Sequence, residues 1–165
     1  MKRLALLILL LPAAAFCQAQ TSNKAITEHD PAVRAKDSTI KVTIIDPATQ
    51  AAAPGDPDWA ALTQTISQKY DAVTADRTVT KAKIYFYYGK DWAQFCKAIV
   101  HYTDNWELGT DYKVLNLNAG MILQNSSDQD DLKEAAKWSK AAADSDPDNQ
   151  AYQATYNALK AKVNP

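Results

Sequence analysis

Apolar residues recur at three- and four-residue intervals along most of the chain after residue 56, which is the spacing of amphipathic α-helices. This spacing predicts six helices, at about 57–70, 75–88, 91–104, 111–125, 128–144 and 149–161. Short polar loops join them, the longest running from Asn105 to Thr110. We therefore expect an all-α, antiparallel array of helix hairpins, in which neighbouring helices bury one another's apolar faces.

Residues at the ends of these segments support the predicted boundaries. Asp56 and Asp111 stand where a carboxylate caps the free N–H groups of a helix, and Asp128 stands where its charge complements the helix dipole. Gly89 stands where a helix C-terminus favours glycine, and Pro147 ends the helix before it.

Two segments also carry the residue types of β-strands. In Thr39–Asp46, the apolar residues Ile40, Val42 and Ile44 alternate with polar ones, which is the spacing of a β-strand and predicts one strand here. A lone strand has no partner in the rest of this sequence, so it would pack as an extended segment, pair with another chain, or be the remnant of a lost β-containing domain. In the second segment, 78–88, a helix is favoured but a strand stays open.

The remaining part before residue 56 has little helical period. Residues 20–38 are polar and are predicted to form a disordered or loosely docked arm. The segment Pro47–Pro57 is rich in proline and alanine, as linkers are. We therefore predict an arm and linker at 20–55, followed by a helical domain at 56–165.

The first residues have the pattern of a secretory signal peptide. Lys2 and Arg3 precede the apolar run Leu4–Leu11, which is too short to span a bilayer, and small residues lead to a predicted cleavage after Ala19. We therefore expect export to the periplasm or the extracellular space. Lipid anchoring at Cys17 is disfavoured, because a bulky phenylalanine precedes this cysteine.

Net charge and cysteine content bear on which partners and which chemistry the chain favours. Removing residues 1–19 removes two of the 18 basic residues and none of the 19 acidic ones, which leaves a net charge of −3. No basic block remains, so nucleic acid is a poor partner, and no later segment predicts a membrane span. One cysteine remains, Cys96, which lies on an apolar stripe and is predicted to be a buried, inert thiol.

No motif of a catalytic or metal site is present in the sequence. The two histidines, His29 and His101, lack zinc-ligand spacing, and His101 is expected to stabilise or pack beside the end of its helix. The acidic run Asp144, Asp146 and Asp148 lacks the glycine and glutamate of a calcium loop. We expect no cofactor and a non-catalytic protein.

The helix at 128–144 has the residue pattern of the second helix of a tetratricopeptide repeat. The matching positions are Ala135, Ser139, Ala142 and Pro147. The preceding helix places Ala119, Ile122 and Leu123 at signature positions that the repeat usually fills with tryptophan, leucine and glycine. The pair thus resembles a degenerate tetratricopeptide repeat.

The wider run 57–160, with DWAQFCKAIVHYTDNW, LNLNAGMIL and DLKEAAKWSKAAADSDPDN, is similar to the helical C-terminal region of exported bacterial thioredoxin-family proteins. That family's redox domain carries a Cys-x-x-Cys pair, which this chain lacks. The resemblance therefore implies a helical scaffold and a role in protein interaction, without redox activity.

Arrays of the tetratricopeptide class usually bind peptides along the first helix of each pair. In this chain those helices are the ones at 75–88 and 111–125. The predicted contacts with a partner are Tyr85, Tyr88, Tyr112 and Gln124. The favoured function is an exported interaction module. The alternatives are an accessory domain of an envelope thioredoxin-type system and a structural partner that adds the strand at 39–46 to another sheet.

Overall fold

The computed structural model describes residues 30–107 and 111–163, and the regular structure within these ranges is helical. No strand occurs in these ranges, so the predicted all-α class is confirmed. The predicted signal peptide, including Cys17, and His29 lie outside the described residues.

The helices follow one another along the chain with short connections. They are α2 (Pro31–Ile40), α3 (Asp46–Ala52), α4 (Trp59–Lys69), α5 (Ala72–Tyr87), α6 (Trp92–Tyr102), α7 (Tyr112–Asn125), α8 (Gln129–Ser145) and α9 (Gln150–Val163). The π-helical segments η1 (Lys41–Ile45) and η2 (Thr103–Glu107) continue α2 and α6. Each helix from α4 to α9 corresponds to one predicted helix, with ends that agree to within three residues.

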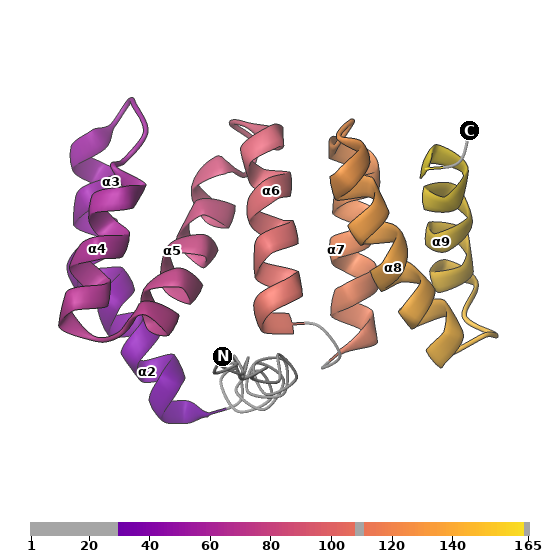
Figure 1. Ribbon diagram of the computed structural model, residues 1–165, viewed down its shortest axis with the longest axis horizontal. Helices are drawn as coiled ribbons and strands as arrows, with labels where there is room; N and C mark the ends of the chain where they lie inside the picture. Colours follow the sequence, from indigo (N-terminus) through magenta and orange to yellow (C-terminus); the bar gives the residue numbers. More distant parts are fainter. Residues whose placement is uncertain (1–29, 108–110, 164–165) are drawn as a thin grey trace, which may run out of the picture.

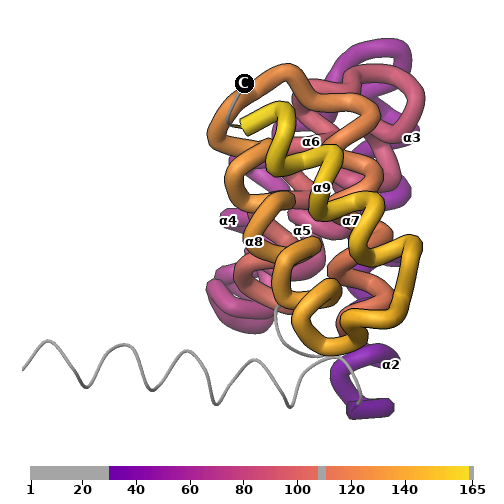
Figure 2. Tube along the Cα trace, turned by 90° about the vertical axis from the view of Figure 1, so that its right-hand side faces the viewer, coloured from indigo at the N-terminus to yellow at the C-terminus, as the bar shows by residue number. Residues whose placement is uncertain are grey.

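Successive helices from α4 to α9 run in opposite directions and lie side by side along the long axis of the molecule (Figure 1). One end of this row is formed by α3 and α4, and the other by α9. Seen from the α9 end, α7 and α8 lie behind α9 (Figure 2). The predicted antiparallel succession is therefore present.

The predicted strand at Thr39–Asp46 is wrong, because this segment is helical. Ile40 and Ile45 are 0% and 3% exposed, whereas Val42 is 62% exposed. Ile40 and Ile45 pack with apolar residues of α4 and α5, and only a helical backbone puts both on one side of the segment. Tertiary packing thus overrides the β propensity of the segment, and its helical backbone does not have the extended conformation that strand addition requires.

The predicted extended arm and linker are also wrong for residues 31–52, whereas residues 53–58 form a non-helical connection. Asp30 accepts a hydrogen bond from the backbone N–H of Ala32 and caps α2. The helix then continues through η1 and α3 as far as Ala52, and this continuous helix packs against α4 and α5. Its proline at position 47 directly follows the π-helical segment η1, where the regular hydrogen-bonding pattern of the helix is already interrupted.

Aspartates cap most of the helices, although one predicted cap is misplaced. Asp111 caps α7 as predicted, and Asp128, predicted as a charge at the start of the next helix, also caps α8. Asp58, rather than the predicted Asp56, caps α4 by accepting from the N–H of Ala61. Asp56 instead accepts a hydrogen bond of 2.8 Å from the hydroxyl of Tyr87, which ties the loop before α4 to the end of α5.

Three further boundary predictions have clear outcomes. Gly89 follows α5 with a φ of +72°, so glycine is the residue that this turn favours. The helix α8 ends at Ser145, two residues before Pro147, as predicted. The loop predicted from Asn105 is wrong at its start, because η2 extends the helix to Glu107.

Among the described residues, the core consists of two clusters of buried apolar side chains. The larger cluster joins the end of α5 to α6, α7, α8 and α9, and its largest fully buried residue is Trp138. The smaller cluster joins α2 and η1 to α4 and α5. Trp59 packs against both clusters, and its indole donates a hydrogen bond of 2.9 Å to the hydroxyl of Tyr87. The continuous helix formed by α2, η1 and α3, named the N-terminal helix, therefore packs in a separate cluster with α4 and α5, which join it to the rest of the array.

Small residues let α8 lie close to both of its neighbours. Ala135, Ser139 and Ala142 are fully buried, and α8 packs extensively against α7 and α9. These are the positions that match the second helix of a tetratricopeptide repeat. Their burial shows that the pattern in the sequence reflects close helix packing.

Candidate functional site

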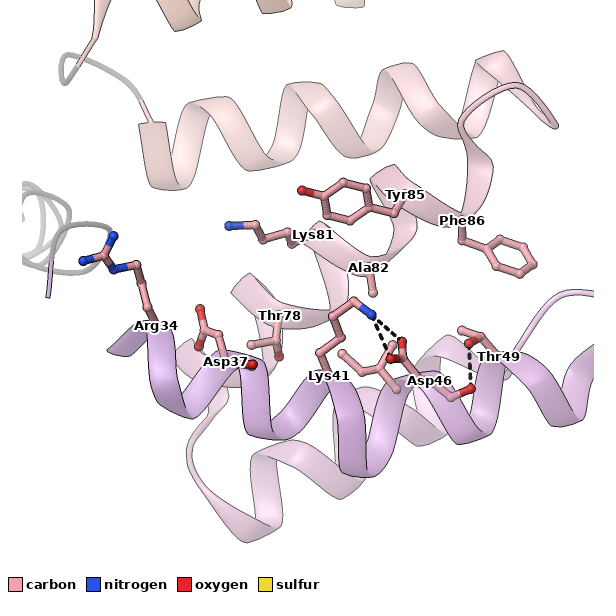
Figure 3. A pocket seen from close by; sticks show the side chains of 12 residues that line it. Arg34, Asp37, Lys41, Asp46, Thr49, Thr78, Lys81, Ala82, Tyr85 and Phe86 are labelled. Carbon is pink, nitrogen blue, oxygen red and sulfur yellow. Dashed lines mark hydrogen bonds and ion pairs between the residues drawn. The ribbon is translucent and has the colours of Figure 1, made fainter. Parts of the chain in front are cut away.

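A groove of about 520 Å³ lies between the N-terminal helix and α5 (Figure 3). The N-terminal helix contributes Arg34, Asp37, Ser38, Lys41, Ile45, Asp46 and Thr49, and α5 contributes Thr78, Lys81, Ala82, Tyr85 and Phe86. Its volume is within the range of sites that bind small molecules or the side chains of a partner.

Helical periodicity explains why these residues line one groove. Arg34, Ser38, Lys41, Ile45 and Thr49 are separated by three or four residues, so they share one face of a continuous helix. The groove-lining residues of α5 have the same spacing. The groove is therefore the space between two facing helical stripes. One stripe includes the π-helical segment η1, a distortion that is frequent at functional sites.

Both carboxylates of the groove are already engaged by cations of the protein. Asp37 accepts two hydrogen bonds from the guanidinium of Arg77, at 3.0 and 2.5 Å. Asp46 accepts from the ammonium of Lys41, which lies 2.8 Å from each of its carboxylate oxygens. The negative charges that line the groove are thus neutralised locally.

Two groove cations have no carboxylate partner within the part of the chain that the structure describes. Arg34 is exposed on α2 and forms no ion pair there. Lys81 likewise forms no ion pair in these ranges, and its ammonium lies 5.6 Å from the ring centroid of Tyr102. Arg34, Lys81 and the hydroxyl of Tyr85 lie toward the same end of the groove, and Phe86 lies toward the other (Figure 3).

The structure places only one of the four predicted partner contacts in this groove. Tyr85 lines it and is 68% exposed. Tyr88 is 63% exposed and makes edge contacts with the rings of Trp92 and Phe95 at the start of α6.

The other two predicted contacts lie on α7. Tyr112 is 47% exposed in the first turn of this helix, and Gln124 is exposed near its end. The helix α6 separates α7 from α5 in the row of helices (Figure 1). The four residues therefore do not form one site, and their role in partner binding stays a prediction.

The groove residues other than Tyr85 were not predicted from the sequence, although a signal for them exists. If residues 31–52 are taken as a helix, the spacing from Arg34 to Thr49 shows a stripe with two cations, Arg34 and Lys41. The alternation of apolar and polar residues around Val42 instead favours a strand, in which these residues would not share one face. The pairing of the stripe with α5 depends on tertiary packing, which the sequence pattern does not contain.

The remaining reactive groups are held in structural contacts. Cys96 is fully buried, as predicted, and burial raises the pKa of its thiol to about 11. The Nε2 atom of His101 lies 2.8 Å from a carboxylate oxygen of Asp76, which links the end of α6 to α5. The other oxygen of Asp76 accepts a hydrogen bond from the indole of Trp106.

The rest of the described chain offers neither a metal site nor a membrane span. Within residues 30–107 and 111–163, no group of three or more histidine, cysteine, aspartate or glutamate side chains is arranged to hold a metal ion. In the same ranges, no helix is both long enough and apolar enough to cross a bilayer.

Comparison with known proteins adds no assignment to this chain. No family model, no curated protein and no solved structure matches it. The resemblance to tetratricopeptide repeats and to exported thioredoxin-family proteins thus rests on the residues quoted above and stays a prediction.

Proposed function

We propose that this protein is an exported, non-catalytic interaction module that binds a segment of a partner protein in the groove between the N-terminal helix and α5. The observation that carries the proposal is the groove itself, where polar side chains, among them the exposed Arg34, Ser38 and Lys41, line the same space as the apolar residues Ile45, Ala82 and Phe86. Binding sites for protein segments commonly combine an apolar centre with a polar rim.

The surrounding array supports this role because it holds the two sides of the groove in place. Ile40 of α2 and Val79 of α5 are buried in the same cluster. The ion pair between Asp37 and Arg77 joins the same two helices. A preorganised groove binds a segment without a large cost for ordering the protein.

Tetratricopeptide-like packing is part of the proposal. The buried small residues of α8 and the antiparallel succession of helices support it. In such an array each helix pair serves as a rigid support for its neighbours. The groove at the N-terminal end would then be the binding surface, and α7 to α9 would stabilise the scaffold.

Photo-crosslinking in cells that produce the protein tests the groove. Benzoylphenylalanine is placed at position 85, in the groove, or at position 117, where Leu117 is 57% exposed on α7. We expect a discrete crosslinked product from position 85 and none from position 117. Equal products from both positions would contradict a specific site.

A blocking substitution completes this test. Ser38 is exposed and lines the groove, so Ser38→Trp should fill it and abolish the crosslink from position 85. Ala35→Trp is the matched control, because Ala35 is exposed on the same helix and does not line the groove. A crosslink that survives Ser38→Trp would place the partner elsewhere.

Export is tested by the mass of the protein recovered from the cell envelope or the medium. A cleaved signal peptide gives a chain that begins at Gln20. Recovery of the full-length chain, beginning at Met1, from the cytoplasm alone would contradict export.

A further inference from the structure

We infer that the groove selects an acidic segment, in which one or two carboxylates contact Arg34 and Lys81 and an adjacent apolar side chain enters the groove. This inference rests on the proposed function, since it names the chemistry of the partner that the groove accepts. It follows from the charges of the groove and from their positions.

The first step is the imbalance of charge. Three cationic side chains line the groove, those of Arg34, Lys41 and Lys81, against the carboxylates of Asp37 and Asp46. Both carboxylates have cationic partners, and one of these, Arg77, comes from outside the groove lining. The groove is therefore locally positive in a chain whose net charge is negative.

The second step is the position of Arg34 and Lys81, the two groove cations that no carboxylate of the described ranges pairs with. Arg34 comes from α2 and Lys81 from α5, so they stand on opposite sides of the groove (Figure 3). The guanidinium offers a planar set of donors suited to a carboxylate, and the ammonium offers a mobile one. The Tyr85 hydroxyl toward the same end adds a further hydrogen-bonding group.

The third step is the apolar surface of the same groove. Ala82 directly follows Lys81, Ile45 also lines the groove, and Phe86 lies toward its other end, so the bound segment needs an apolar side chain in addition to its acidic ones. A purely acidic run would leave this surface uncovered, and a purely apolar segment would leave the cations unpaired. The preferred segment therefore mixes both residue types.

The same observations disfavour a nucleic acid in this groove. A nucleic acid strand needs a run of cations that follows its backbone. Here Arg34 and Lys81 lie at one end, and carboxylates stand among the other lining residues. An acidic protein segment fits this distribution better than a polyanion does.

An array of synthetic octapeptides tests the inference with the purified chain that begins at residue 20. In each peptide, apolar residues alternate with polar ones. Three matched series carry glutamate, glutamine or lysine at all of the polar positions. We expect the glutamate peptides to bind about tenfold more tightly than their glutamine counterparts, which is the usual effect of one or two charge-assisted hydrogen bonds. This advantage should shrink at high salt.

Charge-reversal variants locate the effect. Arg34→Glu and Lys81→Glu should each remove the preference for glutamate peptides. Lys36→Glu is the matched control, because Lys36 is exposed on α2 and does not line the groove. Because Arg34 is exposed, Arg34→Glu should leave the fold intact. This variant therefore tests the inference even if Lys81→Glu disturbs α5.

The outcomes separate this inference from the proposed function. Binding of apolar peptides without regard to charge would overturn the inference and keep the groove as a peptide site. No binding by any peptide would overturn both. A loss of preference in Lys36→Glu as large as in Arg34→Glu, or displacement of the acidic peptide by a single-stranded oligonucleotide at equal concentration, would also overturn the inference.

Discussion

Arg77 of α5 and Asp37 of α2 form a two-point ion pair although they are 40 residues apart in the sequence. The arginine side chain is 4% exposed, and its guanidinium lies 5.6 Å from the ring centroid of Trp106. The pair therefore fixes the N-terminal helix against α5 beside the groove. Because Asp37 is paired with Arg77, it does not serve as the carboxylate partner of Arg34 or Lys81.

Breaking this pair should destabilise the protein strongly. Asp37→Asn leaves a buried guanidinium without its charged partner, and we expect the free energy of unfolding to fall by about 3 kcal/mol. Asp46→Asn is the matched control, since the Lys41–Asp46 pair is exposed and should contribute less than about 1 kcal/mol. Urea denaturation followed by circular dichroism measures both. Equal losses would show that Arg77 is not buried against Asp37 as described.

The helical interpretation of residues 39–46 has its own test in the pair Ile40 and Val42. A strand with alternating faces would bury both side chains alike, whereas the helix buries Ile40 and exposes Val42. We therefore expect Ile40→Ala to lower the free energy of unfolding by about 2–4 kcal/mol and Val42→Ala to change it by less than about 0.5 kcal/mol. Similar losses from both substitutions would favour the strand.

The helices from α4 to α9 could be predicted from the sequence because their apolar residues have the helical period and their ends carry capping residues. The helix that begins at Pro31 could not, because three β-branched residues in alternation resemble a strand more than a helical stripe. What decides between the two is the presence of Ile66 and Val79 on other helices, against which Ile40 and Ile45 pack. That information lies in the tertiary structure.

The candidate site shows the same limit. Tyr85 stands out in the sequence as an aromatic residue of the first helix of a pair, and it lines the groove, while its contact with a partner stays a prediction. Arg34 and Lys81 can be recognised as residues of one site only when α2 and α5 are packed against each other, because the groove lies between these helices. A groove between helices that are far apart in sequence requires the packing of both.

The contact between Trp138 of α8 and Asp104 of η2 gives another prediction. Trp138 is 1% exposed, and its indole donates a hydrogen bond of 3.0 Å to the Asp104 carboxylate. Trp138→Phe removes this hydrogen bond but keeps most of the packing, so we expect a loss of about 1–2 kcal/mol in the free energy of unfolding. Trp138→Ala also leaves a large cavity and should cost about 3–5 kcal/mol.

The hydrogen-bond contribution can be isolated by a double-mutant cycle with Asp104→Ala, which removes the acceptor. If the bond exists, Trp138→Phe should cost less in a chain that already carries Asp104→Ala than in the natural protein. Denaturation curves of the four proteins give the coupling energy. A coupling energy indistinguishable from zero would contradict the contact.

Cys96 predicts how the protein responds to alkaline pH. Burial, with a smaller contribution from the negative charge of Asp131, raises the pKa of its thiol from the ordinary value of 9.0 to about 11. Between these two values the unfolded chain has lost the thiol proton while the folded protein keeps it. The unfolded state then binds fewer protons, so stability falls as pH rises through this window, by at most about 1.4 kcal/mol per pH unit.

Comparison with Cys96→Ala isolates this effect from the tyrosines and lysines, which titrate in both proteins. The natural protein should lose about 1–2 kcal/mol more than Cys96→Ala between about pH 8.5 and about pH 10.5, as measured by urea denaturation. A thiol reagent should also label Cys96 far more slowly in the folded protein than in urea, because only the thiolate reacts and the side chain is fully buried. Parallel pH curves for the two proteins, together with rapid labelling of the folded state, would place the thiol at the surface and contradict the packing of α6.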